Sequence, residues 1–416
     1  MSTRRVVITG IGTINPLGKN VAETWEKVKN GVSGIDTISK FDAAGYSSRV
    51  AGEVKDFDFR QYFDEETIKT AKRLEPFVHY AVAALKEALT DSKLDIEREP
   101  ERVGICIGSG IGGIYSAFDN SSALLTKGHR RVSPFYIPAT IGNIASGFIS
   151  ILHGIKGPNL SMQTACATAN HSMGTAFMLI KAGMADAMIA GGTEATIMPL
   201  GVSGFCNMHA LSTKYNDTPA KASRPFDRDR DGFVMGEGAG VLVVEELSHA
   251  EKRGAPILAE VLGVGMSGDA YDLVIPEPEG HGAYRSMQQA VGLAGIQPDD
   301  INYINAHGTS TPVGDAAECK AVARLLGGRH EGVCVGSTKS MHGHLLGATA
   351  GLEAIICVMA IRDGMAPPNI NIDNLDPDIT LSCINTKPVS LDINVAVSNS
   401  FGFGGHNSTL ILRKMT

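Results

Sequence analysis

One cysteine lies in a stretch whose composition suits a nucleophile. Cys166 lies in MQTACATAN, where a short strand-like run gives way to a helical pattern, and alanine flanks it on both sides. A thiol at a helix N-terminus meets the positive end of the helix dipole, which favours the thiolate. A buried structural cysteine in a crowded turn would fit the same stretch. Cys166 alone therefore does not define a reaction.

Two further motifs place histidines where they could work with a thiol. His307 lies in NAHGTSTPVGD directly after an apolar run, and open α/β sheets bind ligands at the carboxyl ends of their strands. Lys339, His342 and His344 crowd the turn STKSMHGHLLGATAG before a helical pattern. His342 and His344 make a poor metal site, since no carboxylate or third ligand is nearby. One histidine beside a cysteine is typical of acyl transfer.

Two glycine-rich stretches could bring backbone N–H groups close to a ligand. The stretch NSFGFGGHN, residues 399–407, has the glycine density of an oxyanion-binding loop, although a plain tight turn would look the same. The stretch GSGIGG, residues 108–113, matches the dinucleotide pattern GxGxxG. The acidic residue expected about 20 residues later is missing there, so we favour a sharp turn over a dinucleotide site.

Short apolar runs and helical patterns alternate along the chain and must position these motifs. Continuous apolar strands between helices indicate an α/β protein with a mostly parallel sheet that is covered on both faces. We expect strands at residues 6–9, 103–108, 187–190, 240–245, 303–306, 333–336 and 395–398. We expect helices at residues 77–89, 171–182, 283–294, 316–326 and 352–362.

A loose internal repeat divides the chain into two similar halves. The stretch Leu160–Ile180 resembles Val333–Ile361, since each contains a strand, a small polar turn and a long helix. The division falls near residue 255, which gives domains 1–255, with Cys166, and 256–416, with the histidines. No linker separates them, so the halves should pack tightly together.

Composition excludes several classes of protein. The 416 residues are 43% hydrophobic and 19% charged, with a net charge of −7, which argues against general nucleic-acid binding. No apolar stretch is long enough for a signal peptide or a membrane span. The seven cysteines lack paired spacing, so we expect free thiols in a reducing cytoplasm.

Taken together, the motifs resemble those of the elongating β-ketoacyl-acyl carrier protein synthases of fatty-acid synthesis, which have the thiolase-like fold. The resemblance covers the whole chain, and the type II group fits better than type I. Its most specific stretches are TACATANHSMG, RPFDRDRDGFVMGEGAG, NAHGTSTPVGD, STKSMHGHLLGA and NSFGFGGHN. It implies two α/β halves in five layers, α-β-α-β-α, and a homodimer that works with acyl carrier protein. It also implies condensation of an acyl-enzyme with a malonyl thioester, with no redox cofactor.

The resemblance also assigns roles to individual residues. Cys166 matches the nucleophile, His307 and His344 match the catalytic pair, and Lys339 a supporting cation. The N–H groups of Cys166 and Phe403 match the oxyanion hole, and Phe403 also matches a gating aromatic residue. Thr309 and Thr311 match pantetheine contacts; Ile111, Tyr136 and Phe205 match acyl-pocket positions; Asn305, Glu353, Ser398 and Asn399 match a structural cation site; and Lys69, Lys72, Arg73, Arg130, Arg131 and Lys214 match a docking patch for the carrier protein.

Some positions depart from the pattern, and some alternatives stay open. Asp272 and Val274 stand where relatives often carry His and Thr, which puts one pantetheine contact in doubt, and His342 and His406 are also atypical. A type I or polyketide-type ketosynthase of the same fold is the main alternative. A thiolase or a starter-type synthase would not need His344, a non-catalytic partner subunit would lack Cys166, and a Cys–His hydrolase would leave the second histidine unexplained.

Overall fold

The structure is a computed structural model and describes residues 4–328 and 331–415. Its main element is a ten-stranded sheet in the order β10-β9-β13-β14-β8-β1-β7-β6-β4-β5. The strands are β1 Val6–Ile14, β4 Val103–Gly108, β5 Asn159–Leu160, β6 Ala187–Glu194, β7 Gly238–Glu246, β8 Ala259–Gly268, β9 Tyr303–Asn305, β10 Cys334–Gly336, β13 Val395–Gly402 and β14 His406–Arg413.

The sheet consists of two five-stranded halves with the same topology. Strands β1, β7, β6, β4 and β5 come from the first half of the chain, and β8, β14, β13, β9 and β10 repeat their order and directions. Within the sheet, the halves are joined by the pairing of β1 and β8, over the three residues from Val6 to Ile8. This arrangement confirms that the chain consists of two similar α/β halves.

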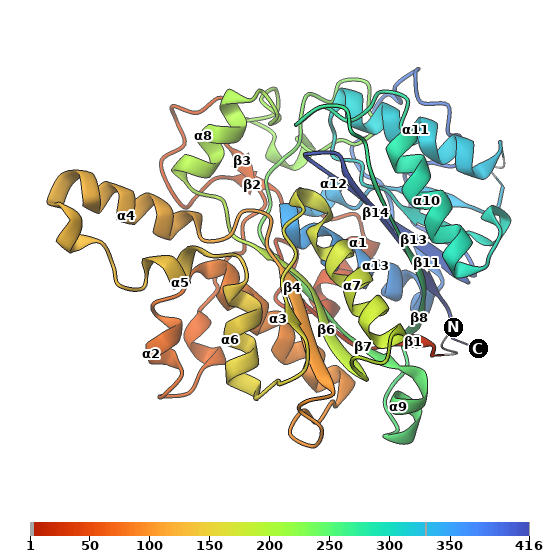
Figure 1. Cartoon of the computed structure of the whole chain (residues 1–416). Helices are drawn as coiled ribbons and strands as arrows, with labels where there is room; N and C mark the ends of the chain where they lie inside the picture. The colour runs from red at the N-terminus through yellow and green to blue at the C-terminus, as the bar shows by residue number, and fades with distance from the viewer. Residues whose placement is uncertain (1–3, 329–330, 416) are drawn as a thin grey trace.

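Helices complete the layers (Figure 1). Helices α7 (Thr168–Lys181) and α13 (Thr349–Asp363) contact strands of both halves and so lie between them. Helices α3 (Pro76–Ser92) and α6 (Ile144–His153) cover the outer face of the first half. Helices α10 (His281–Ala294) and α11 (Pro312–Leu326) lie on the second half. The result is the five-layer arrangement expected from the resemblance, with α13 buried along almost its whole length.

The expectation of a mostly parallel sheet is wrong. Strand β7 runs antiparallel to β1 and β6, and β14 runs antiparallel to β13 and β8. Strands β5, β8 and β14 were also missing from the predicted set. Strands that are covered on both faces are continuously apolar whatever their direction, so the apolar runs could not reveal it. The predicted helices are all present, with ends that differ by at most four residues.

One segment projects from this body. Helix α4 (Ile114–Lys127), the turn η2 (His129–Arg131) and helix α5 (Tyr136–Thr140) form an arm that extends to the left in Figure 1. None of the fourteen residues of α4 is buried. No helix in the described part of the chain is long and apolar enough to cross a membrane.

Candidate active site

The first part of the site is the turn that holds Cys166. The residue lies in a short 3-10 turn, Ala165–Ala167, that leads directly into α7. Ala165 has a positive φ of 50°, and the matching turn before α13 has a positive φ of 48° at Leu346. The shared backbone conformation supports the internal repeat. The turn leaves the Cys166 side chain 7% exposed at the base of a cavity.

His344 lies within hydrogen-bonding distance of the thiol. Its Nε2 is 2.9 Å from Cys166 Sγ, and its Nδ1 is 3.0 Å from Thr349 Oγ1. The backbone of His344 is fixed by bonds to Val234 O and from Gly236 N, both 2.7 Å. These two residues belong to the motif RPFDRDRDGFVMGEGAG, which thus positions the histidine. A proton can pass between the thiol and the imidazole at this distance.

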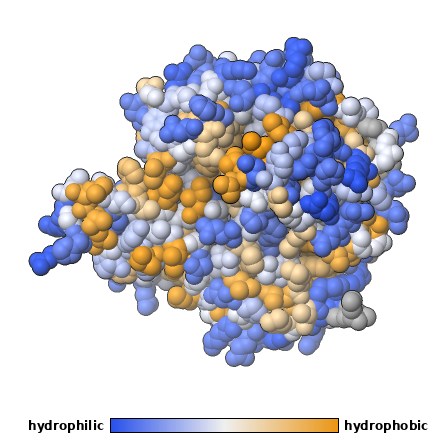
Figure 2. Space-filling view, turned by 45° about the horizontal axis from the view of Figure 1, so that its top comes forward, coloured by the Kyte–Doolittle hydropathy of each residue, from blue (hydrophilic) through white to orange (hydrophobic). Residues whose placement is uncertain are grey.

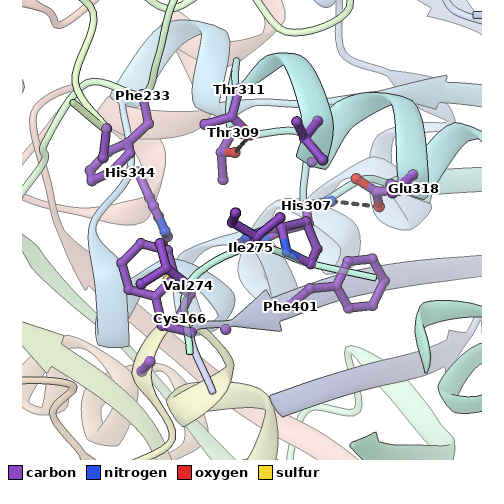
Figure 3. A pocket seen from close by; sticks show the side chains of 18 of the residues that line it. Cys166, Phe233, Val274, Ile275, His307, Thr309, Thr311, Glu318, His344 and Phe401 are labelled. Carbon is purple, nitrogen blue, oxygen red and sulfur yellow. Dashed lines mark hydrogen bonds between the residues drawn. The ribbon is translucent and has the colours of Figure 1, made fainter. Parts of the chain in front are cut away.

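His307 completes the group from the end of β9. Its ring centre is 5.4 Å from that of His344, and the two planes are nearly perpendicular at 84° (Figure 3). One potential ligand atom each from Cys166, His307 and His344 lies within 4.8 Å of the other two. The structure therefore brings together three residues that lie up to 178 positions apart in the sequence. Phe401 packs against the His307 ring, at 5.7 Å between centres.

Lys339 lies behind the histidines and, together with burial, keeps them neutral. Its Nζ is 2.6 Å from Glu353 Oε1, and both side chains are buried. Burial and then the charge of Lys339 hold the pKa values of His307 and His344 well below the usual 6.5, so both rings are neutral. Neutral imidazoles keep an N–H that can donate to a developing negative charge.

The expectation of a ready thiolate is wrong for the free enzyme. Burial raises the pKa of Cys166 to about 12, although Lys339 and the backbone N–H of Phe403 act in the other direction. Desolvation disfavours the charged form more strongly here than the helix dipole favours it. The thiol must therefore lose its proton as it reacts, and His344 is the group in contact with it.

Two backbone N–H groups surround the sulfur. Those of Phe403 and Cys166 lie near Sγ, and each favours the charged form and so lowers the pKa of the thiol. Phe403 lies in the three-residue loop between β13 and β14, where Gly404 and Gly405 have φ values of 82° and 72°. Such values favour glycine, which explains the glycine-rich stretch. The pair is placed as an oxyanion hole requires, since an oxygen on the carbon bonded to Sγ would lie near both donors.

A cavity of about 530 Å³ leads to this group. Of the residues matched to substrate contacts, Thr309, Thr311, Ile111 and Phe205 line it, together with Phe403. The two threonine hydroxyls are 3.0 Å apart. Tyr136, the fifth residue of that set, lies in the projecting arm and is not among the lining residues. Tyr136 therefore does not line the cavity of its own chain.

The GSGIGG stretch forms a turn that is tied down from inside. The carboxylate of Glu194 accepts from the N–H groups of Gly110 (2.8 Å), Ile111 (3.3 Å) and Gly347 (3.0 Å). These donors would have to bind the phosphates of a dinucleotide. An internal carboxylate uses them instead, and it also links the two halves of the fold next to Cys166.

Several residues that support the site did not stand out in the sequence. Glu318 in α11 accepts from the backbone N–H groups of His307 and Gly308, both at 2.8 Å, and so fixes the histidine turn. Arg230 is 4% exposed and donates to the carbonyls of Thr311 (3.2 Å) and Pro312 (2.8 Å). The only signal for Glu318 was its position three residues after Asp315 in the same helix.

The remaining predicted residues fall into three places. His342 is buried outside the cavity and bonds Gly343 O and Thr338 Oγ1, so it does not share a ligand with His344. The residues matched to a cation site are all fully buried: Asn305, Glu353, Ser398 and Asn399. The residues matched to a docking patch are all exposed: Lys69, Lys72, Arg73, Arg130, Arg131 and Lys214.

Metal binding at the reactive group is disfavoured by the charge behind it. Cys166, His307 and His344 offer donor atoms of the type that zinc prefers. The field of Lys339, which already lowers both histidine pKa values, would oppose a divalent cation at the same point. The buried group is better suited to stabilising negative charge.

Known proteins resemble this chain in sequence and in fold along its whole length. Residues 3–250 match the family "Beta-ketoacyl synthase, N-terminal domain", and residues 258–373 match "Beta-ketoacyl synthase, C-terminal domain". The protein named 3-oxoacyl-[acyl-carrier-protein] synthase 2 of Coxiella burnetii is 48% identical over 100% of both chains. The protein of that name from Staphylococcus aureus (strain COL) is 49% identical over 99% of this chain and 98% of its own.

Solved structures agree. A beta-ketoacyl synthase from Burkholderia phymatum superimposes with a TM-score of 0.91 at 31% identity, covering 100% of both chains. The ishigamide ketosynthase/chain length factor gives 0.90 at 33% identity, over 99% of this chain and 100% of the other. With a thiolase-like fold, a buried Cys–His–His group, matches to both domain families and full-length relatives, the chain belongs to the beta-ketoacyl synthase family.

Proposed function

We propose that this protein is an acyltransferase that elongates fatty acids by condensing an acyl group with a malonyl group, each delivered on acyl carrier protein. The observation that carries this proposal is the group formed by Cys166, His307 and His344 at one end of a single cavity. A hydrolase would need only one histidine. Two neutral imidazoles beside the thiol suit a reaction in which an enolate must be held while it attacks carbon.

The first half-reaction transfers the acyl group to the enzyme. Cys166 Sγ attacks the acyl thioester as its proton moves to His344 Nε2, 2.9 Å away. The tetrahedral oxyanion is held by the N–H groups of Cys166 and Phe403. Its collapse breaks the bond to the carrier's sulfur, which leaves as a thiol after taking the proton from His344. The products are an acyl-enzyme and free carrier thiol.

The second half-reaction forms the carbon–carbon bond. The carboxylate of the malonyl thioester leaves as carbon dioxide, and the electron pair of that bond becomes an enolate. The N–H group of His307 donates to the enolate oxygen, and His344 donates from the tautomer that carries its proton on Nε2, with Nδ1 then accepting from Thr349 Oγ1. The carbon attacks the acyl carbonyl, the same two backbone N–H groups hold the new oxyanion, and Cys166 is expelled. A proton from solvent then restores the thiol, and the product is 3-oxoacyl-[acyl carrier protein].

The two halves of the fold divide this work. Residues 1–255 supply the nucleophile, and residues 256–416 supply the histidine pair, Lys339 and the Phe403 loop. The central helices α7 and α13 begin at turns next to the reactive group, and Glu194 joins the turn before α13 to the 108–113 turn of the first half through its hydrogen bonds. Tight packing of the halves is therefore a condition for activity.

An acidic carrier protein fits the exposed cations. The docking patch comprises Lys69, Lys72, Arg73, Arg130, Arg131 and Lys214, and none of these makes an ion pair with another described residue at the distances that define one. Arg73 stacks on the ring of Phe135 at 4.3 Å, which links α2 (Ile68–Ala71) to the arm. A related solved structure shows a type II PKS acyl-carrier protein in complex with its ketosynthase. Free cations of one sign attract an acidic partner.

A second copy of the chain fits the projecting arm. Helix α4 has no buried residue, yet Phe118, Leu124 and Leu125 are 41%, 48% and 85% exposed. Figure 2 shows hydrophobic side chains along the arm, on the left of the view. The edge strand β5 lies in the same half of the sheet and could pair with its own copy. We therefore place the dimer contact on the arm and β5, which would also bring Tyr136 close to a partner.

Two further assignments are part of the proposal. Glu353 Oε2 and Ser398 Oγ are buried and lack a hydrogen-bond partner, so a structural cation held by oxygen ligands fits there. The cation would be held on the Oε2 side of Glu353, whose Oε1 pairs with Lys339. The reaction needs no redox cofactor, because no step changes an oxidation state through a carrier. The described part of the chain contains no disulfide.

The test is reconstitution with carrier-bound substrates. Purified protein, an acyl-carrier primer and malonyl-carrier should yield the 3-oxoacyl carrier and carbon dioxide, both read by mass spectrometry. Cys166→Ala should fold normally and form neither the acyl-enzyme nor the condensation product. Condensation by the Cys166→Ala protein, or hydrolysis of the primer without condensation by the wild type, would contradict the proposal.

A further inference from the structure

A run of three apolar residues is left exposed between β8 and α10. Leu273, Val274 and Ile275 are 81%, 39% and 51% exposed. Consecutive exposed apolar residues are unfavourable in a soluble protein unless they serve a function. The three residues differ in where they point. Val274 and Ile275 line the cavity together with Cys166 and His307, and Leu273 does not (Figure 3).

The run is held in place by its own backbone. The Asp272 carboxylate accepts from the N–H groups of Val274 (2.8 Å) and Ile275 (2.9 Å). Leu273 O accepts from Gly404 N at 2.8 Å, which joins the run to the loop that carries Phe403. None of these bonds uses an apolar side chain. The side chains of Val274 and Ile275 are therefore positioned at the cavity without being needed for the fold.

The cavity at this level has two unlike walls. Thr309 and Thr311 supply hydroxyl groups from the turn after β9, whereas Val274 and Ile275 supply only hydrocarbon. Hydroxyl groups suit the amides of a thioester-bearing arm. Hydrocarbon cannot bind the arm's polar groups, but it does hinder ordered water from reaching the bottom of the cavity.

The proposed reaction has one stage at which water is a hazard. Once the acyl group is on Cys166, the first carrier leaves, and the cavity has no arm in it until malonyl-carrier arrives. Water could then attack the acyl carbonyl, with loss of its proton to His344 Nε2, and break the carbon–sulfur bond to give a free acid and the thiol. During this interval only protein side chains can keep water away.

We propose that Val274 and Ile275 form an apolar seal that protects the acyl-enzyme from hydrolysis between the two half-reactions. This inference rests on the proposed function, because it requires an acyl-enzyme on Cys166. It makes the two residues determinants of whether the acyl group goes to carbon or to water. It assigns no such role to their neighbour Leu273.

The experiment measures how long the acyl-enzyme survives. Wild type, Val274→Thr, Ile275→Ser and the matched control Leu273→Ser are acylated with an acyl-carrier primer, freed of primer, and followed by intact mass. We expect the half-life to fall by at least about fivefold in Val274→Thr and Ile275→Ser, with no change in Leu273→Ser. Discharge by hydroxylamine, a small nucleophile, should rank the four proteins in the same order.

Each outcome separates the seal from the proposed function. If wild-type protein forms no adduct on Cys166, the proposed function fails and the seal fails with it. If all four adducts form and decay at one rate, the proposed function stands and the seal is overturned. Equal acceleration in Leu273→Ser would also overturn it, because a general loosening of the loop would then be the cause. Circular dichroism and melting curves establish that all four proteins are folded.

Discussion

The replacement Lys339→Met tests how the site manages its buried charges. Lys339 is 0% exposed and Glu353 is 0% exposed, with 2.6 Å between Nζ and Oε1. Methionine has a similar length and no charge, so it removes the ion pair and leaves little space. The substitution strands a carboxylate in the interior. Removing one partner of a buried pair costs about 3–5 kcal/mol of folding free energy.

The size of that cost should depend on pH. Burial raises the pKa of Glu353 to about 7 even beside Lys339, compared with 4.5 in an exposed carboxyl group. Without Lys339 the pKa rises further, and the folded state holds a proton that the unfolded state has released. A group whose pKa is raised on folding stabilises the protein at pH values below the pKa of the group in the unfolded state. This stabilisation is lost as the pH rises through the pKa of the group in the folded state. Lys339→Met should therefore be least stable on the alkaline side of neutrality.

A double-mutant cycle separates structure from chemistry. Urea unfolding of wild type, Lys339→Met, Glu353→Gln and the double variant gives the free energy of unfolding at equal protein concentration. We expect the double variant to recover most of the loss, since no charge remains buried. We expect neither protein that lacks Lys339 to recover condensation, since the field on the two histidines is gone. A double variant as unstable as Lys339→Met, or one with full activity, would refute this reasoning.

Three further predictions concern residues around the reactive group. Burial lowers the pKa of His171 to about 4 from 6.5, so the wild type should lose stability as the pH falls from 6.5 toward 4. Urea unfolding at about pH 4.5 should show a smaller loss for His171→Gln. Equal losses in the two proteins would contradict this. Arg230→Lys removes donors to the carbonyls of Thr311 and Pro312. In steady-state kinetics we expect the KM for the primer to rise about three- to tenfold, with kcat nearly unchanged. A loss in kcat alone would argue against a positioning role. Glu194→Gln should lower the free energy of unfolding by about 1–3 kcal/mol. The backbone N–H groups now donate to two carboxylate oxygens, and the amide side chain of Gln offers only one acceptor oxygen. An unchanged free energy of unfolding would show that the turn does not depend on this carboxylate.

The sequence predicted the parts of the fold that are local. The repeat was visible because the turns before α7 and α13 need the same small residues and are followed by the same kind of helix. The reactive group could be named from Cys166, His307 and His344, since each lies in a turn next to a strand or helix end. These signals depend on residues that are close together in the chain, so they can be recognised in a single sequence.

Other features depend on tertiary contacts and could not be seen. The raised pKa of Cys166 follows from burial by residues of both halves, which the dipole argument did not include. Apart from its spacing from Asp315, nothing in the sequence marked Glu318 in α11, yet it is 2% exposed and supports His307. The antiparallel directions of β7 and β14 depend on which strands they pair with, and the side-chain pattern of a buried strand does not record this. Tyr136 matched a pocket position by sequence, but its place is set by an arm that leaves the body of the chain.

The most direct test of the account is the fate of an acyl group placed on the enzyme. Intact-mass spectrometry after incubation with a labelled acyl-carrier primer should show one acyl adduct, mapped by digestion to Cys166. Addition of malonyl-carrier should then remove the adduct, release carbon dioxide and transfer the label to a 3-oxoacyl carrier product two carbons longer. An adduct on another residue, or discharge of the label only as free acid, would contradict the assignment of this site to carbon–carbon bond formation.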